Sequence, residues 1–265
     1  MSSYESALRD FEKTTATCNG ITRDVYRIGT GPGVIVIHEI PGITPQVADF
    51  GRRVAAAGCT AVLPVLFGEP GKPLGVGYAL QILVSGCVAK DFATFATDTT
   101  SPATVWLREL AAQVHEECGG PGVGAVGMCF TGGFALAMMV DDRMLAPVLS
   151  QPSLPFPFSK RHRADLGIST ADLARVKQRA ENGQCLLGLR FSADKSSPSQ
   201  RFDTLQRELG DAFIAVEIDS APGNPYGIKR SAHSVLTNDL VDEPGHPTRE
   251  ALDQVLTFFR ERLGV

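Results

Sequence analysis

A cysteine between small residues is the clearest candidate for covalent chemistry in this chain. Cys129 lies in the segment 127–133 (GMCFTGG), after an apolar run at 123–126 and before a second at 134–139. This order predicts a strand, a sharp turn and a helix, which is typical of a nucleophile elbow. The turn would expose the thiol and leave the amide of Phe130 at a helix N-terminus, where it could stabilise an oxyanion. An inert buried thiol has similar surroundings.

A nucleophilic thiol needs a base, and the base needs a group that orients it. In a sheet that carries a nucleophile elbow, the acid follows the nucleophile along the chain and the histidine follows the acid. Asp194 comes just after the apolar run 185–191, and His233 lies in the loop after the last predicted strand. An aspartate after a strand is also a common turn residue, and a lone histidine is often structural. The three residues together favour a hydrolase.

Apolar runs typical of strands alternate with capped helical stretches along the chain. This order predicts an α/β fold with a mostly parallel sheet and helices on both faces, which would position these residues. Strands are expected at 34–37, 60–67, 123–126, 145–150, 185–191 and 213–218. Helices are expected to begin at Thr44-Pro45, Ser101-Pro102, Thr170 and Ser197-Pro198, and to span 248–263. The first thirty residues predict a short helix and a hairpin.

Composition limits the classes of function. With 265 residues, 43% hydrophobic and 20% charged, the chain suits one domain over 1–265. With a net charge of −4, the chain lacks the excess of basic residues that is typical of nucleic-acid-binding proteins. No apolar stretch is long enough to span a membrane. The six cysteines lack C-x-x-C spacing and no secretory signal is visible, so we expect a cytoplasmic protein with reduced thiols, no metal site and no cofactor. It would be a monomer or a small homo-oligomer.

Two segments interrupt the alternation, 68–100 and 151–169. Long irregular segments after parallel strands commonly form the walls or lid of a site. The first is rich in glycine, and the second carries the basic cluster 160–163. We interpret this cluster as a solvated face, with anion binding as the alternative.

The chain resembles the dienelactone hydrolase family, α/β-hydrolase-fold enzymes that use cysteine where lipases use serine. The resemblance rests on the elbow at 127–133, the surroundings of Asp194 and His233, and the segment 37–42 (IHEIPG). It implies cleavage of a carboxylic ester or lactone through an acyl-enzyme thioester, as in a carboxymethylenebutenolidase. It also implies that Glu39 contacts the nucleophilic thiol and that the amide of Ile40 is the second oxyanion donor. A carboxylate there would keep the resting thiol protonated and protect it from oxidation.

One departure from the family concerns the substrate. The founding enzymes bind a substrate carboxylate with two arginines, one of them shortly after the histidine, but residues 234–237 here are Ser-Val-Leu-Thr. We therefore expect neutral esters or lactones to be preferred, since an unpaired buried carboxylate is costly to desolvate. Arg190, Lys229 and Arg230 remain candidates for an anion contact.

Two rival functions share features of this pattern. A class I glutamine amidotransferase also places cysteine on an elbow, but it needs a His-x-Glu pair, and His233-Ser234-Val235 lacks the glutamate. A catalytically weak hydrolase-fold protein that binds ligands or senses thiol oxidation is the alternative that stays open. The presence of Cys129, Asp194 and His233 together favours the hydrolase.

Overall fold

A single sheet organises the computed structural model, which describes residues 4–83, 100–153 and 163–265. Its eight strands run in the order β1-β2-β4-β3-β5-β6-β7-β8. They are β1 (Glu12–Cys18), β2 (Ile21–Ile28), β3 (Gly33–Ile37), β4 (Thr60–Pro64), β5 (Val123–Met128), β6 (Met144–Ser150), β7 (Leu186–Phe191) and β8 (Phe213–Ile218). β2 pairs antiparallel with β1 and with β4, and all pairs from β4 to β8 are parallel. This confirms the predicted mostly parallel sheet.

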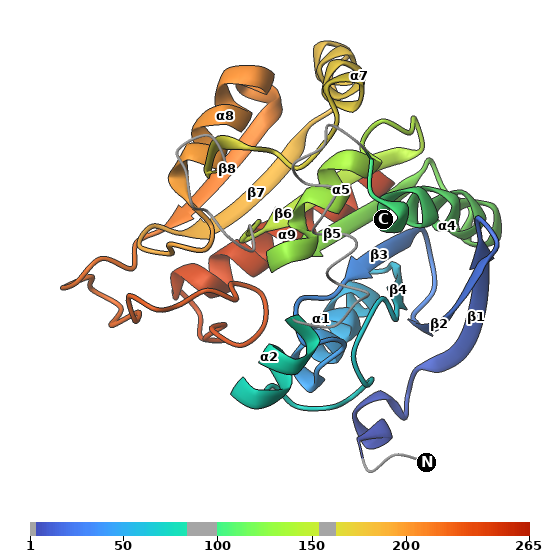
Figure 1. Cartoon of the computed structure of the whole chain (residues 1–265), viewed down its shortest axis with the longest axis horizontal. Coiled ribbons are helices and arrows are strands. Elements are labelled where there is room, and N and C mark those ends of the chain that lie inside the picture. The colour runs from blue at the N-terminus through green and yellow to red at the C-terminus, as the bar shows by residue number, and fades with distance from the viewer. Residues whose placement is uncertain (1–3, 84–99, 154–162) are drawn as a thin grey trace.

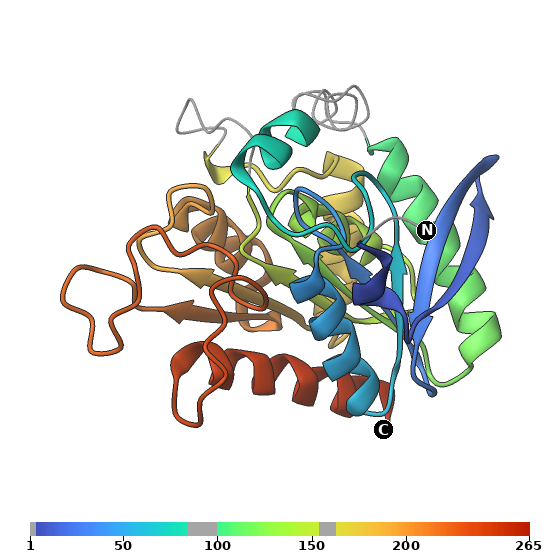
Figure 2. The same cartoon turned by 90° about the horizontal axis from the view of Figure 1, so that it is seen from below.

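Helices cover both faces of the sheet (Figure 1). The elements are η1 (Glu5–Leu8), α1 (Pro45–Ala56), α2 (Val76–Leu83), α4 (Pro102–Cys118), η2 (Cys129–Thr131), α5 (Gly132–Met138), α7 (Thr170–Glu181), α8 (Ser199–Leu209), η3 (Gly210–Ala212) and α9 (Pro247–Leu263). Figure 2 shows α1 and α9 together on one face, where their apolar residues join one core cluster with β3 and β7. Helices α4, α5, α7 and α8 contribute to the cluster on the opposite face.

Local sequence explains most helix starts. The hydroxyl of Thr44 accepts from the amide of Val47 at 3.3 Å, and that of Ser101 accepts from Thr104 at 3.1 Å, with proline as the next residue in both cases. The predicted cap Thr170 is wrong by one residue, because extended Ser169 accepts from the amide of Asp172 at 3.1 Å.

The predicted start of the next helix at Ser197-Pro198 is also shifted. Helix α8 begins at Ser199, with Pro198 in the cap position and no side-chain cap. Near the N-terminus, the predicted short helix is η1 and the hairpin is β1–β2. Asn19 and Gly20 make its turn with φ of 48° and 72°, the left-handed conformation that two-residue hairpins favour.

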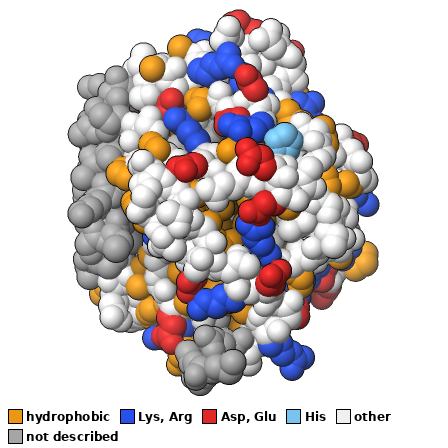
Figure 3. All heavy atoms as spheres, turned by 90° about the vertical axis from the view of Figure 1, so that its right-hand side faces the viewer, with side chains coloured by type: hydrophobic (Ala, Val, Ile, Leu, Met, Phe, Trp, Pro, Cys, Tyr) orange, Lys and Arg blue, Asp and Glu red, His pale blue; other side chains and the backbone are white. Residues whose placement is uncertain are grey.

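The two predicted wall segments fall only partly within the described residues, since 84–99 and 154–162 lie outside them. Of the basic cluster, Arg163 alone is described, and it is exposed. On the face beside the β1–β2 hairpin and α4, side chains of both charges are interspersed (Figure 3). Within the described ranges, each helix is too short or too polar to cross a membrane.

Candidate active site

The nucleophile elbow follows β5 directly. Cys129 has φ of 57°, an unusual backbone conformation for a residue with a side chain and one that marks a strained turn. A Cβ at Gly127 would lie 2.2 Å from the carbonyl oxygen of Thr131, and one at Gly132 would lie 2.7 Å from the Cα of Pro152. The small residues around the cysteine are therefore required by close backbone approach.

Thr131 stabilises this turn in a way that its sequence position did not indicate. Its hydroxyl accepts from the amide of Met128 at 2.9 Å and lies 2.9 Å from the carbonyl oxygen of Ile37, to which it can donate. The side chain is fully buried. Thr131 therefore ties the elbow to the end of β3, the neighbouring strand.

The structure brings Asp194 and His233 together at the carboxyl ends of the strands. The Nδ1 atom of His233 lies 2.6 Å from Oδ2 of Asp194, whose other oxygen accepts from the amide of Ser196 at 2.8 Å. Burial alone would raise the pKa of Asp194, but the hydrogen bonds to His233 and to backbone amides lower it below 3.8. Asp194 is therefore ionised at neutral pH and can orient the imidazole.

His233 also interacts with Cys129. Burial disfavours the charged ring, yet Cys129 and Asp194 together outweigh it and raise the pKa of His233 well above 6.5. Cys129 and Asp194 thus both act on the imidazole, and its Nδ1 atom is engaged by the acid. An imidazole in such an arrangement can take a proton from a thiol.

The loop that carries the histidine, residues 233–239, is called the His233 loop below. The carboxylate of Asp239 closes it by accepting from the amides of His233 at 2.8 Å and Ser234 at 2.9 Å. Two bonds to adjacent amides fix the backbone of the catalytic candidate. Asp239 was not predicted, because its partners are visible only in the folded loop.

Glu39 lies just past β3 and is only 2% exposed. Its carboxylate accepts from Ser234 at 2.7 Å, from Gln151 and Asn238 at 3.3 Å each, and from the hydroxyl of Thr237. All four donors are neutral. Within the described ranges, Cys129 is not among the hydrogen-bond partners of Glu39, and no lysine or arginine lies within ion-pair distance of it.

Gln151 extends this network. It follows β6 with φ of 36°, and its Oε1 accepts from the amide of Val235 at 3.3 Å while its Nε2 donates to Glu39. A non-glycine residue in this conformation is held there by its surroundings. Gln151 was missed by sequence reasoning, although it begins the irregular segment after β6.

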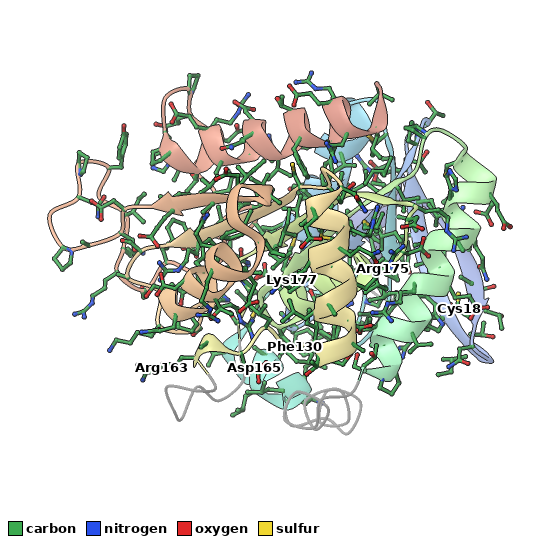
Figure 4. The ribbon with its side chains drawn as sticks, turned by 90° about the horizontal axis from the view of Figure 1, so that it is seen from above. Cys18, Phe130, Arg163, Asp165, Arg175 and Lys177 are labelled. Carbon is green, nitrogen blue, oxygen red and sulfur yellow. The ribbon has the colours of Figure 1, made fainter. Side chains whose placement is uncertain are left out.

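The two proposed oxyanion donors come from neighbouring strands. Phe130 lies in η2 immediately after Cys129, and Ile40 lies beyond β3, which pairs with β5 through Ile37 and Gly127. Figure 4 shows Phe130 on the side of the molecule that also carries α2 and the labelled residues Arg163 and Asp165. Both amides therefore belong to the end of the sheet where the thiol emerges.

Two residues near the site have structural tasks. His38 is fully buried, accepts from the amide of Leu66 at 3.2 Å and has its pKa lowered by burial to about 4, so it stays neutral. Arg190 is 2% exposed, pairs with Glu217 and donates to the carbonyl oxygens of Ser197 at 2.9 Å and Ser192 at 3.1 Å. Its donors support the Asp194 loop, so Arg190 is not available to a substrate anion.

An open cavity of about 420 Å³ flanks the Asp194–His233 pair. Its walls include Lys195 and Arg230, both exposed and without an acidic partner in the described part of the chain. These cations lie beside the candidate base, whereas Lys229 does not line the cavity. In the described ranges, histidine, cysteine and acidic side chains form no group of three suited to a metal ion.

Comparisons with known sequences point to one family. The profile described as "Dienelactone hydrolase family" matches residues 24–263. A Saccharomyces cerevisiae protein named "Putative carboxymethylenebutenolidase" is 26% identical over 198 residues, which cover 72% of this chain and 68% of that protein. A Synechocystis protein of the same name is 29% identical over 114 residues, 43% of this chain and 45% of that protein, so less than half of that relative is matched.

Solved structures show the same fold at low identity. A "Putative Dienelactone Hydrolase" from Klebsiella pneumoniae superimposes with a TM-score of 0.63 at 19% identity, covering 95% of this chain and 98% of that one. The dienelactone hydrolase-like promiscuous phosphotriesterase P91 from metagenomic libraries gives 0.62 at 17% identity, covering 96% and 98%. At this level the likeness establishes the α/β-hydrolase fold.

Proposed function

Because the chain belongs to the dienelactone hydrolase family, we propose that it cleaves a carboxylic ester or lactone with Cys129 as nucleophile, His233 as base and Asp194 as the group that orients the base. The observation that carries the proposal is the alignment of these side chains. Asp194 lies 2.6 Å from His233, and the same imidazole interacts with the thiol. A nucleophile that interacts with a base, and an acid that orients this base, are the requirement for covalent catalysis of acyl transfer.

The reaction follows from the positions of these groups. His233 takes the thiol proton, and the sulfur attacks the carbonyl carbon while the carbonyl oxygen gains the charge. The amides of Phe130 and Ile40 are the proposed donors to that oxyanion. The tetrahedral intermediate collapses to a thioester, and the leaving alkoxide takes the proton from His233. Water then attacks the thioester with His233 as base, which releases the acid and restores the thiol.

The substrate class is proposed from two observations. The two relatives above carry the name "Putative carboxymethylenebutenolidase", which points to lactones. In this chain Arg190 is engaged by its own loop and no arginine follows His233 within the next four residues. We propose a neutral ester or lactone of modest size, with Glu39 as a further member of the site.

We also propose where the protein works, how its chain is organised and how it assembles. Five cysteines in the described residues are unpaired, which supports a protein that works with reduced thiols in the cytoplasm. One sheet extends through the described residues, which supports a single domain over 1–265. We propose a monomer or a small homo-oligomer that acts on small molecules without nucleic acid or membrane.

The test compares Cys129→Ala with wild type on a neutral chromogenic ester and on a neutral lactone. Cys185→Ala is the matched control, because Cys185 lies just before β7, at the opposite end of the strand from Asp194. We expect turnover to vanish in Cys129→Ala and to persist in the control, and mass spectrometry of quenched wild type to show an acyl group on Cys129. Full activity of Cys129→Ala would refute the mechanism. Absence of turnover in wild type, with ligand binding intact, would favour the binding or thiol-sensing alternative.

A further inference from the structure

The acceptor positions of Glu39 are fully used by residues that surround the base. A carboxylate offers about four acceptor sites on its two oxygens. Ser234 and Gln151 donate to Oε2, and Thr237 and Asn238 donate to Oε1. A hydrogen bond from the Cys129 thiol would therefore have to displace one of the four donors.

Three of these four donors lie in the His233 loop, one, four and five residues after the histidine. Glu39 itself is anchored beside Ile40 at the end of β3, one strand away from the elbow strand β5. The carboxylate thus joins the loop that carries the base to the strand pair that carries the thiol and the proposed oxyanion donors. Three side chains of the loop make that connection to a single carboxylate.

The hydrogen bonds between Glu39 and the His233 loop are of a strong kind. Hydrogen bonds to an ionised acceptor are roughly twice as strong as those between neutral groups, and a buried carboxylate without such donors is costly. Glu39 is 2% exposed, and Ser234 and Thr237 are also buried. If the loop moved away, the buried Glu39 carboxylate would lose its hydrogen-bond donors. The position of His233 is therefore coupled to Glu39.

We propose that Glu39 is a positioning residue that holds His233 against Cys129, in place of the thiol-suppressing role that the family resemblance implies. This inference rests on the proposed function, because it concerns the geometry of the proposed base and nucleophile. Glu39 acts through the loop and needs no contact with sulfur. The two roles make opposite predictions for the free enzyme, since a suppressor slows the resting thiol and an anchor keeps it reactive.

The first experiment measures alkylation of Cys129 by iodoacetamide in the free enzyme across pH, with labelling at each cysteine read by mass spectrometry. In Glu39→Gln the anchor is weakened, so we expect labelling of Cys129 at neutral pH to fall about 10-fold and its rate profile to move to higher pH. A faster rate in Glu39→Gln would show suppression and overturn the proposal. A rate within about 2-fold of wild type would overturn it as well.

The second experiment avoids any change to the buried charge. Thr237→Val keeps the size of the side chain and removes one donor, whereas Thr237→Ser retains the hydroxyl. We expect kcat on a neutral ester to fall several-fold in Thr237→Val, with KM nearly unchanged, and to return to within about 2-fold of wild type in Thr237→Ser. Equal kcat in the valine and serine variants, with both folded by circular dichroism, would contradict the anchor.

The controls separate this inference from the proposed function. If Cys129→Ala hydrolyses esters like wild type, the mechanism itself fails, whatever Glu39 does. If turnover depends on Cys129 while Glu39→Gln and Thr237→Val leave alkylation and kcat unchanged, the mechanism stands and the positioning role of Glu39 fails.

Discussion

Two buried carboxylates at the same end of the sheet are used in different ways. Asp194, after β7, has one oxygen on an imidazole and the other on a backbone amide. Glu39, after β3, receives four neutral donors. An acid beside a titratable ring orients that ring and stabilises its charged form. An acid among hydroxyls and amides can only hold them in place. Partners, rather than burial, therefore decide whether a carboxylate orients a reacting group or anchors a loop.

Replacing Asp194 or its partner His233 should reduce kcat the most. Asp194→Asn leaves the shape of the side chain but removes the charge that orients His233, so we expect kcat on a neutral ester to fall about 10⁴-fold. His233→Ala should cost more, because the base itself is lost. Steady-state kinetics on purified, folded variants checks both values. An Asp194→Asn enzyme with wild-type kcat would show that another acid orients the histidine.

A smaller effect is expected when the loop is loosened from its other side. Asp239 binds the amides of His233 and Ser234 and touches neither sulfur nor the imidazole ring in the described contacts. Both amides donate to the same oxygen, Oδ2, so Asp239→Asn can keep both hydrogen bonds and loses only the charge that strengthens them. We therefore expect kcat to fall by no more than about 10-fold. Matching losses in Asp239→Asn and Asp194→Asn would remove the distinction between anchoring and orienting acids.

The charge of the substrate should also affect the rate of hydrolysis. A neutral and a carboxylated lactone of equal bulk should differ by several-fold in kcat/KM, in favour of the neutral one. Lys195 and Arg230 beside the cavity are exposed, and exposed ion pairs contribute about 0–1 kcal/mol. If the carboxylated lactone is preferred and Arg230→Gln abolishes that preference, the exposed cations recognise the substrate and our neutral assignment is wrong.

The smallest effect concerns stability against pH. The pKa of His233 is raised above 6.5, so its contribution to folding is complete below that value and is lost as pH rises through the raised pKa. The pKa of Asp194 is lowered below 3.8, so its contribution holds above 3.8 and is lost as pH falls through the lowered pKa.

Melting curves of wild type and His233→Gln test the first of these shifts. The stability advantage of wild type should therefore shrink by a few degrees in Tm between about pH 6 and pH 10. A constant difference across that range would show that the pKa of His233 is the same in the folded and unfolded chain.

The sequence predicted those parts of the site that depend on short-range order. The elbow at 127–133, the acid after β7 and the histidine after β8 could all be placed by chain order, because parallel strands end at one edge of the sheet. The cap of α7 was wrong by one residue because adjacent Ser169 and Thr170 are both good caps.

Partners far apart in the chain could not be predicted in the same way. Glu39 was found through the family resemblance, but its donors lie more than 100 residues away, and no local pattern pairs them. No role was predicted for Thr131, because its bond to the carbonyl oxygen of Ile37 forms only when β3 and β5 lie side by side.

That threonine couples the two strands mechanically. Its single hydroxyl spans the seam between β3 and β5, accepting from one and donating toward the other. The spacing of the strand ends that carry the Phe130 and Ile40 amides thus depends partly on a buried side chain. Evolution or an engineer could adjust the width of that gap at position 131 without altering a residue that a substrate touches.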